Sequence, residues 1–117
     1  MRDQKIKITE TATQALGAGA LAYSYTFLRD GYLDGVEIHF SGACSQTVSV
    51  TRDSVDGANY DTVLKSEALS VVTDFTYFPS RKRYFRKGDI IKIGITSGGS
   101  TTAYLTALLE EEHTWVK

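Results

Sequence analysis

The segment Lys87–Glu112, KGDIIKIGITSGGSTTAYLTALLEEE, is the longest apolar stretch of the chain. Apolar and polar residues alternate along Ile91–Ile95, which is the two-residue period of a strand with one buried face. The same alternation runs through Ala103–Leu109. Between these two halves, Ser97–Ser100 contains a pair of glycines, which accept the positive φ angles that tight turns need. The segment therefore predicts a β-hairpin at the centre of a core.

Shorter alternating segments precede this hairpin and are separated by turn residues. They are Lys5–Thr9, Leu21–Leu28, Leu33–Phe40, Gln46–Arg52, Tyr60–Lys65 and Leu69–Phe78. Turn signals recur about every 8–12 residues, the spacing of a sandwich or a jelly roll. We therefore expect an all-β fold, a single jelly-roll-like β-sandwich of about eight antiparallel strands.

The length of 117 residues fits one domain with its own core. Residues 21–112 are predicted to form the β-sandwich domain. Residues 1–20 are expected to be an N-terminal arm or edge strand followed by a connector, and residues 113–117 a C-terminal tail. The lysines of Lys5–Thr9 suit a sheet edge, and this segment could also add to the sheet of a neighbouring molecule.

Composition excludes several classes of protein. The net charge is −1, so no global field attracts nucleic acid or a membrane. Cys44 is the single cysteine, which excludes an internal disulfide and a multi-cysteine zinc site. No apolar run approaches the ~18 residues of a membrane span, and the amino end lacks the apolar region of a secretion signal. We expect no membrane association.

Residues that could carry chemistry have simpler structural explanations. Three aspartates within residues 53–61 do not match a calcium loop, and aspartate is a common turn residue. His39 and Cys44 could form a base and a nucleophile, but a lone cysteine is more often a small apolar residue. Neighbouring carboxylates in Glu110–Glu112 splay apart along a strand. We therefore predict no enzyme activity, no catalytic residue, no cofactor and no metal.

The most distinctive surface feature is a basic segment interleaved with aromatic residues. It consists of Arg81, Lys82, Arg83, Tyr84, Phe85, Arg86 and Lys87. Such a pattern fits single-stranded nucleic acid, a solvated sheet edge, or an acidic protein surface. We favour the protein contact over nucleic acid because the rest of the chain is acidic, and arginine pairs well with carboxylates. Trp115, isolated in a charged tail, is a second candidate contact.

Five short segments follow one another in a definite order through the middle of the chain. They are Asp34–Gly42 (DGVEIHFSG), Val48–Ser54 (VSVTRDS), Gly57–Thr62 (GANYDT), Thr73–Phe75 (TDF) and Gly88–Ile93 (GDIIKI). In this order they resemble small virion proteins of tailed bacteriophages, in particular the capsid decoration, or cement, class. One departure is the basic segment itself, which stands where such proteins often carry proline.

The resemblance implies a non-catalytic protein that binds and stabilises the outer surface of an assembled capsid. Its expected partner is the major capsid protein, its expected assembly a homotrimer, and its expected location the virion surface after synthesis in the host cytoplasm. Two alternatives stay open. A receptor- or carbohydrate-binding module of a tail or head fibre predicts an aromatic cleft, whereas a small enzyme predicts a constellation around His39.

Overall fold

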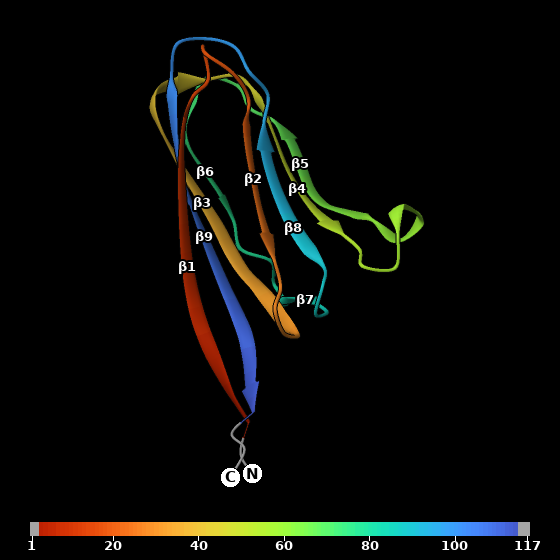
Figure 1. Cartoon of the computed structure of the whole chain (residues 1–117). Coiled ribbons are helices and arrows are strands. Elements are labelled where there is room, and N and C mark those ends of the chain that lie inside the picture. Colours follow the sequence, from red (N-terminus) through yellow and green to blue (C-terminus); the bar gives the residue numbers. More distant parts are fainter. Residues whose placement is uncertain (1–2, 115–117) are drawn as a thin grey trace.

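Two antiparallel sheets pack face to face in the structure, a computed structural model that describes the backbone of residues 3–114 and the side chains of residues 5–112 (Figure 1). The first sheet has the order β1 (Asp3–Ala15), β9 (Thr102–Thr114), β3 (Gly31–Cys44) and β6 (Val72–Tyr77), and β7 (Arg83–Phe85) also pairs with β3. The second has the order β2 (Leu21–Thr26), β8 (Ile90–Ile95), β4 (Thr47–Asp53) and β5 (Thr62–Ala68).

The strand order confirms the predicted all-β sandwich. Apart from the short β7 and the β4–β5 pair, each strand is followed by one in the other sheet, and the orders 1-9-3-6 and 2-8-4-5 are those of a jelly roll. The remaining element is a single 3-10 turn, η1 (Ala58–Tyr60), in the β4–β5 connection. Within the part of the chain that the structure describes, no helix is long and apolar enough to cross a membrane.

The hairpin predicted for the segment Lys87–Glu112 is wrong. β8 pairs with β2 and β4, whereas β9 pairs with β1 and β3, so residues 96–101 cross between the sheets as an arch. The arch is held by the β1–β2 connection, because the N–H of Leu16 donates to Thr101 O and the N–H of Gly98 donates to Leu16 O. Gly98 and Gly99 have the expected positive φ angles of 138° and 69°. An alternating apolar pattern with glycines in the connection is compatible with an arch between two sheets as well as with a hairpin within one sheet.

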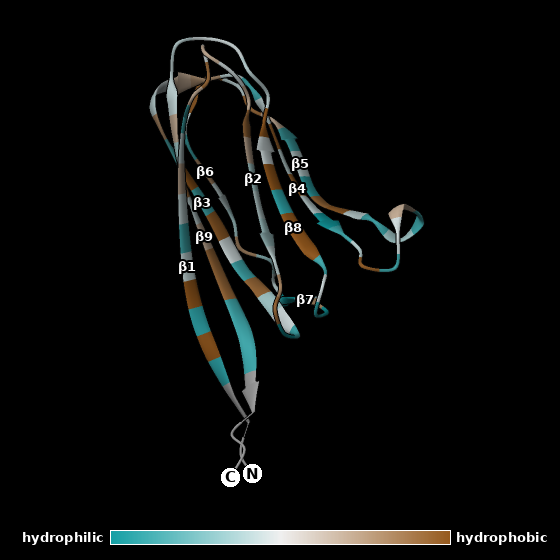
Figure 2. Cartoon of the chain, viewed as in Figure 1, coloured by the Kyte–Doolittle hydropathy of each residue, from teal (hydrophilic) through white to brown (hydrophobic). Residues whose placement is uncertain are grey.

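The core lies between the inward faces of the two sheets. Its fully buried side chains include those of Leu33, Val36, Ile38, Phe40, Val48, Val50, Ile91, Ile93, Ile95, Leu105 and Leu109. In Figure 2 brown and teal alternate along β3 and β8, as expected for strands with one buried face. At the end of the core nearest β7, Phe27 stacks on Phe85 with ring centroids 4.7 Å apart.

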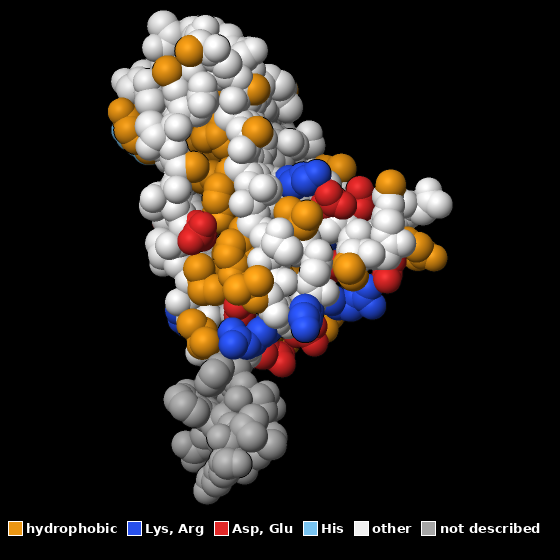
Figure 3. All heavy atoms as spheres, viewed as in Figure 1, with side chains coloured by type: hydrophobic (Ala, Val, Ile, Leu, Met, Phe, Trp, Pro, Cys, Tyr) orange, Lys and Arg blue, Asp and Glu red, His pale blue; other side chains and the backbone are white. Residues whose placement is uncertain are grey.

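The first strand lies at the edge of the sandwich. β1 pairs with β9 along its whole length, well beyond the short segment Lys5–Thr9 that shows clear alternation. Its other edge has no strand partner among the described residues. Figure 3 shows apolar side chains gathered in a band between β1 and β2. Ile8 of β1 and Tyr23 and Tyr25 of β2 pack partly buried against the core. The apolar side chains of the sandwich are therefore less well shielded from solvent between β1 and β2.

Candidate protein-docking surface

Backbone pairing holds the basic segment against the first sheet. Arg83–Phe85 form β7, which pairs antiparallel with Gly31–Leu33 of β3. The following turn is fixed by Asp89, whose carboxylate accepts the Arg86 N–H at 2.8 Å, and by Asp30, whose carboxylate accepts the Lys87 N–H at 2.9 Å. The side chains of the basic segment therefore project from a backbone that these hydrogen bonds hold in place.

Phe85 is not available for a partner, and its prediction as a contact residue is wrong. Its side chain is 0% exposed and stacks on Phe27. The two-residue period of β7 turns Phe85 into the core and its neighbour Tyr84 outward, where it is 43% exposed. Sequence alone could not settle this, because a three-residue strand has no measurable period.

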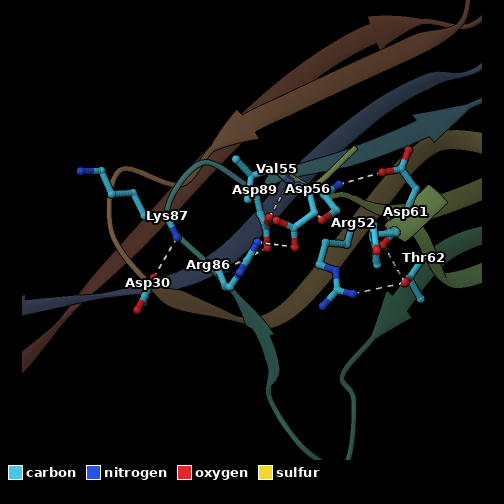
Figure 4. A network of polar contacts seen from close by, with 11 residues as sticks. Asp30, Arg52, Val55, Asp56, Asp61, Thr62, Arg86, Lys87 and Asp89 are labelled. Atoms are coloured by element: carbon cyan, nitrogen blue, oxygen red, sulfur yellow. Dashed lines mark hydrogen bonds and ion pairs between the residues drawn. The ribbon is translucent and has the colours of Figure 1, made fainter. Parts of the chain in front are cut away.

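The cations of the segment fall into two groups. Lys82 contacts Glu110 at 2.6 Å and Asp34 at 3.6 Å, and Arg86 forms an ion pair with Asp56. These carboxylates raise the pKa values of both basic groups. The remaining three cations, those of Arg81, Arg83 and Lys87, have no carboxylate partner among the described residues. Figure 4 shows the Lys87 side chain directed away from its neighbours.

Arg81 and Arg83 flank an exposed phenylalanine. Phe78 is 54% exposed, and its ring lies over Gly35, where any Cβ would collide with it. Beside this ring is a hollow of about 420 Å³, lined by Leu64, Tyr77, Phe78, Pro79, Ser80, Arg81 and Arg83. Arg83 Nε donates to the Tyr77 hydroxyl at 3.3 Å. We call the exposed side chains of Phe78, Arg81 and Arg83 around this hollow the Phe78–Arg83 surface.

Beneath the loop lies a buried charge cluster that sequence reasoning missed. Glu110 is 1% exposed on the outer side of β9 and accepts hydrogen bonds from Lys82 at 2.6 Å and Lys7 at 3.3 Å. Asp34 joins it from β3, at a bulge between Leu33 and Gly35. A hydrogen bond with Asp34, followed by the contacts with both lysines, holds the pKa of Glu110 well below its usual range. Burial, and then the neighbouring Glu110, raises the pKa of Asp34.

This cluster predicts a loss of stability in acid. The Glu110 contribution is complete above its ordinary pKa of 4.5 and is lost as pH falls through its lowered folded-state pKa. Asp34 acts in the opposite sense, because the folded protein takes up its proton above the ordinary pKa of 3.8. Asp34 protonation therefore favours the folded state as pH falls toward 3.8, and below about pH 4 only the loss of the Glu110 contribution continues.

Urea unfolding across the acid range tests this prediction. The free energy of unfolding should fall steadily between about pH 4 and pH 2. Glu110→Gln should be less stable at neutral pH and should show a shallower fall in acid. Glu112→Gln, the neighbouring change on the same face of β9, should keep the parent profile. Parallel profiles for the parent and Glu110→Gln would contradict the assignment.

His39 has an orienting carboxylate but not the nucleophile considered from sequence. Its Nδ1 lies 2.9 Å from Asp74 Oδ1 on the exposed outer face of the first sheet, and this contact lowers the pKa of Asp74. Cys44 is 1% exposed and belongs to the core. A His39–Cys44 pair is therefore excluded. Asp74 carries no sequence signal for this role, because β3 and β6 meet only in the folded sheet.

The three aspartates near residue 57 have structural roles. Asp53 contacts Lys92 at 2.8 Å, Asp56 pairs with Arg86, and Asp61 Oδ1 accepts the Ser54 N–H at 2.8 Å. No group of three or more potential metal ligands occurs among the residues that the structure describes. Trp115, the remaining candidate contact, lies outside the described residues.

The fold and this surface define the class of protein: a jelly-roll β-sandwich with a basic, aromatic loop fixed on one edge of its first sheet. Neither any protein-family model nor any curated protein matches the chain.

Proposed function

We propose that this chain is a structural virion protein of a tailed bacteriophage, which binds the outer surface of the assembled capsid and stabilises it without catalysis. The observation that supports the proposal is the Phe78–Arg83 surface. It places two arginines, which have no carboxylate partner in the part of the chain that the structure describes, beside an exposed phenylalanine. Aromatic residues and arginine are the types enriched at the centres of protein interfaces.

The loop is prepared for such a contact before a partner arrives. Lys82 anchors it from below through the buried carboxylate of Glu110, and Phe78 is seated on Gly35. Because these two contacts hold part of the loop before binding, less of its freedom is lost on binding, and more of the contact energy appears as affinity. Arg81 and Arg83 can each pair bidentately with a carboxylate, so an acidic capsid surface suits them.

Stabilisation of a shell needs only modest affinity at each site. A protein that binds the expanded lattice and not the collapsed one shifts the equilibrium toward the expanded form by mass action. Many copies on one lattice add avidity, and a homotrimer would multiply it. The jelly roll also occurs among viral capsid domains, which agrees with the proposal as a fold-level analogy.

The free edge of β1 is a second candidate contact. Its residue Ile6 is 40% exposed, and the edge borders the apolar band between β1 and β2. An extended segment of the major capsid protein could add to this edge as a further strand. The main-chain hydrogen bonds would then supply affinity, and the apolar band would receive alternate side chains.

Charge reversal tests the Phe78–Arg83 surface. The double change Arg81→Glu and Arg83→Glu should weaken binding to purified capsids about 100-fold or more, because two attractive contacts become repulsive. Co-sedimentation with capsids assembled without this chain measures the effect. A matched double reversal, Lys65→Glu and Lys92→Glu in the second sheet, should leave binding within about threefold. Equal binding by both double variants would remove this surface from the proposal.

Position in the virion is tested by immunogold labelling of virions of the encoding phage. Dense label over the head supports capsid decoration. Label confined to the tail would replace this proposal with the tail or fibre alternative. If antibody that recognises the purified chain leaves intact virions unlabelled, the chain is not an exposed virion component and the proposal fails.

A further inference from the structure

A second, polar cleft lies between the β4–β5 connection and the β7–β8 region. Its volume is about 350 Å³, at the lower end of the range of about 300–1,000 Å³ for small-molecule pockets. It is lined by Arg52, Ser54, Asp56, Asn59, Tyr60, Asp61, Thr62, Tyr84, Arg86 and Asp89. Figure 4 shows the side chains of Arg52 and Arg86, which both line this cleft. None of these groups belongs to the Phe78–Arg83 surface.

Arg52 retains unused hydrogen-bond donors in this cleft. Its Nη2 donates to Thr62 Oγ1 at 3.3 Å, but its Nε is buried and has no partner among the described residues. A guanidinium carries five N–H donors in a rigid plane, and a buried donor left unpaired is costly. Because Nε itself is covered by the protein, a ligand in the cleft would be met by the terminal N–H groups of Arg52 that Thr62 does not use.

The carboxylates around the cleft are largely committed to the fold. Asp89 accepts the Val55 N–H and the Arg86 N–H, each at 2.8 Å. Asp61 accepts the Ser54 N–H through Oδ1, and Asp56 pairs with Arg86. These contacts hold both walls of the cleft in place. They also leave oxygen lone pairs on Asp61 and Asp56 that can accept hydrogen bonds from a ligand hydroxyl.

Two exposed tyrosines stand at the rim of the cleft and come from different parts of the chain. Tyr60 of η1 is 62% exposed, and Tyr84 of β7 is 43% exposed. An aromatic ring offers a flat apolar face together with a polar hydroxyl. Planar amide, carboxylate and guanidinium groups beside such faces match a sugar ring, which presents apolar C–H faces and a circumference of hydroxyl groups.

The charge of the lining selects among saccharides. Two guanidinium groups, from Arg52 and Arg86, face three carboxylates, from Asp56, Asp61 and Asp89. An anionic ligand would meet a net negative wall, as would the phosphates of a nucleic acid. A neutral ligand that both donates and accepts hydrogen bonds avoids this repulsion. We propose that the cleft between Tyr60 and Tyr84 binds one unit of a neutral saccharide, with Arg52 as its principal donor.

The test uses the full chain and simple probes. Methyl glycosides of glucose, galactose, mannose and N-acetylglucosamine are titrated separately into isotope-labelled protein, and amide chemical shifts are followed by NMR. At least one glycoside should produce saturable shift changes centred on the amides of residues 52–62 and 84–89. Because no fixed charge is exchanged, the affinity should be nearly independent of salt.

Three single variants locate the site. Tyr60→Ala and Tyr84→Ala should each weaken binding about tenfold or more, as expected for the loss of an anchoring aromatic contact. Tyr104→Ala is the matched control, because Tyr104 is similarly exposed at 48% but belongs to the outer face of the first sheet. It should bind as the parent does.

Several outcomes would overturn the proposal. One is the absence of saturable shifts with all four glycosides at tens of millimolar sugar. Another is binding that Tyr104→Ala weakens as much as Tyr84→Ala does. A third is binding only to carboxylated or sulfated glycans on an array, with an affinity that falls steeply with salt. Because the capsid test uses different residues, either proposal can fail without the other.

Discussion

Replacing Phe85 with alanine is expected to lower the free energy of unfolding by about 3–5 kcal/mol. The side chain is 0% exposed and stacks on Phe27, with ring planes 15° apart. The substitution removes a large apolar surface from the core and leaves a cavity that paired strands cannot close easily. Because β7 holds only three residues against β3, its pairing depends on this anchor. Urea unfolding measures the loss.

Two further variants keep this prediction testable if Phe85→Ala does not fold. Phe85→Leu should cost about 1–2 kcal/mol, because most of the buried volume remains. Tyr84→Ala, one position earlier and facing outward, should cost about 1 kcal/mol or less. A smaller loss for Phe85→Ala than for Tyr84→Ala would show that β7 does not present its side chains as described.

Replacing Glu111 with alanine is expected to cost about 2–4 kcal/mol. Its carboxylate is 3% exposed and accepts hydrogen bonds from the Tyr25 hydroxyl at 2.6 Å and from the Leu28 N–H at 2.9 Å. These bonds join β9 of the first sheet to β2 and the turn after it. Without the carboxylate both donors lose their acceptor, and Arg29, 3.9 Å away, loses its ion partner.

Graded variants separate these contributions. Glu111→Gln keeps one oxygen acceptor of similar shape and should lose roughly half as much stability as Glu111→Ala. Tyr25→Phe removes only the hydroxyl and should cost about 1 kcal/mol. Glu112→Ala, on the opposite face of β9, serves as the control and should change stability by less than about 1 kcal/mol. If Glu111→Ala is no more costly than Glu112→Ala, Glu111 does not join the sheets.

The neighbouring residues Glu110 and Glu111 show which structural features an alternating strand pattern predicts and which it does not. The two-residue period correctly predicts that Glu110 and Glu111 point to opposite faces. It does not predict that both are buried, because burial depends on segments distant in the chain. The Tyr25–Leu28 region covers Glu111, and Lys82 from the β6–β7 connection contacts Glu110. From sequence, both carboxylates were placed only along a strand, with no buried partner assigned to either.

For the candidate docking surface, too, the sequence identified a segment but not how its side chains pack. The unusual charge of Arg81–Lys87 drew attention to this loop, since a run of cations is readable from composition. Sequence did not show that Lys82 and Arg86 are paired internally or that Phe85 is buried. Phe78 was assigned only to the end of a strand. Its exposure depends on Gly35, a residue of another strand, which leaves room for the ring.

The all-β class, the apolar side of each of the strands β8 and β9, and the turn glycines followed from sequence alone. Each is a local property, because alternation and φ preference act over a few residues. Which strand pairs with which was decided by tertiary structure. Ile91–Ile95 and Ala103–Leu109 could satisfy their hydrogen bonds as one hairpin or through separate neighbours with nearly the same local energy. The jelly roll pairs them separately because the two apolar faces then meet across the core.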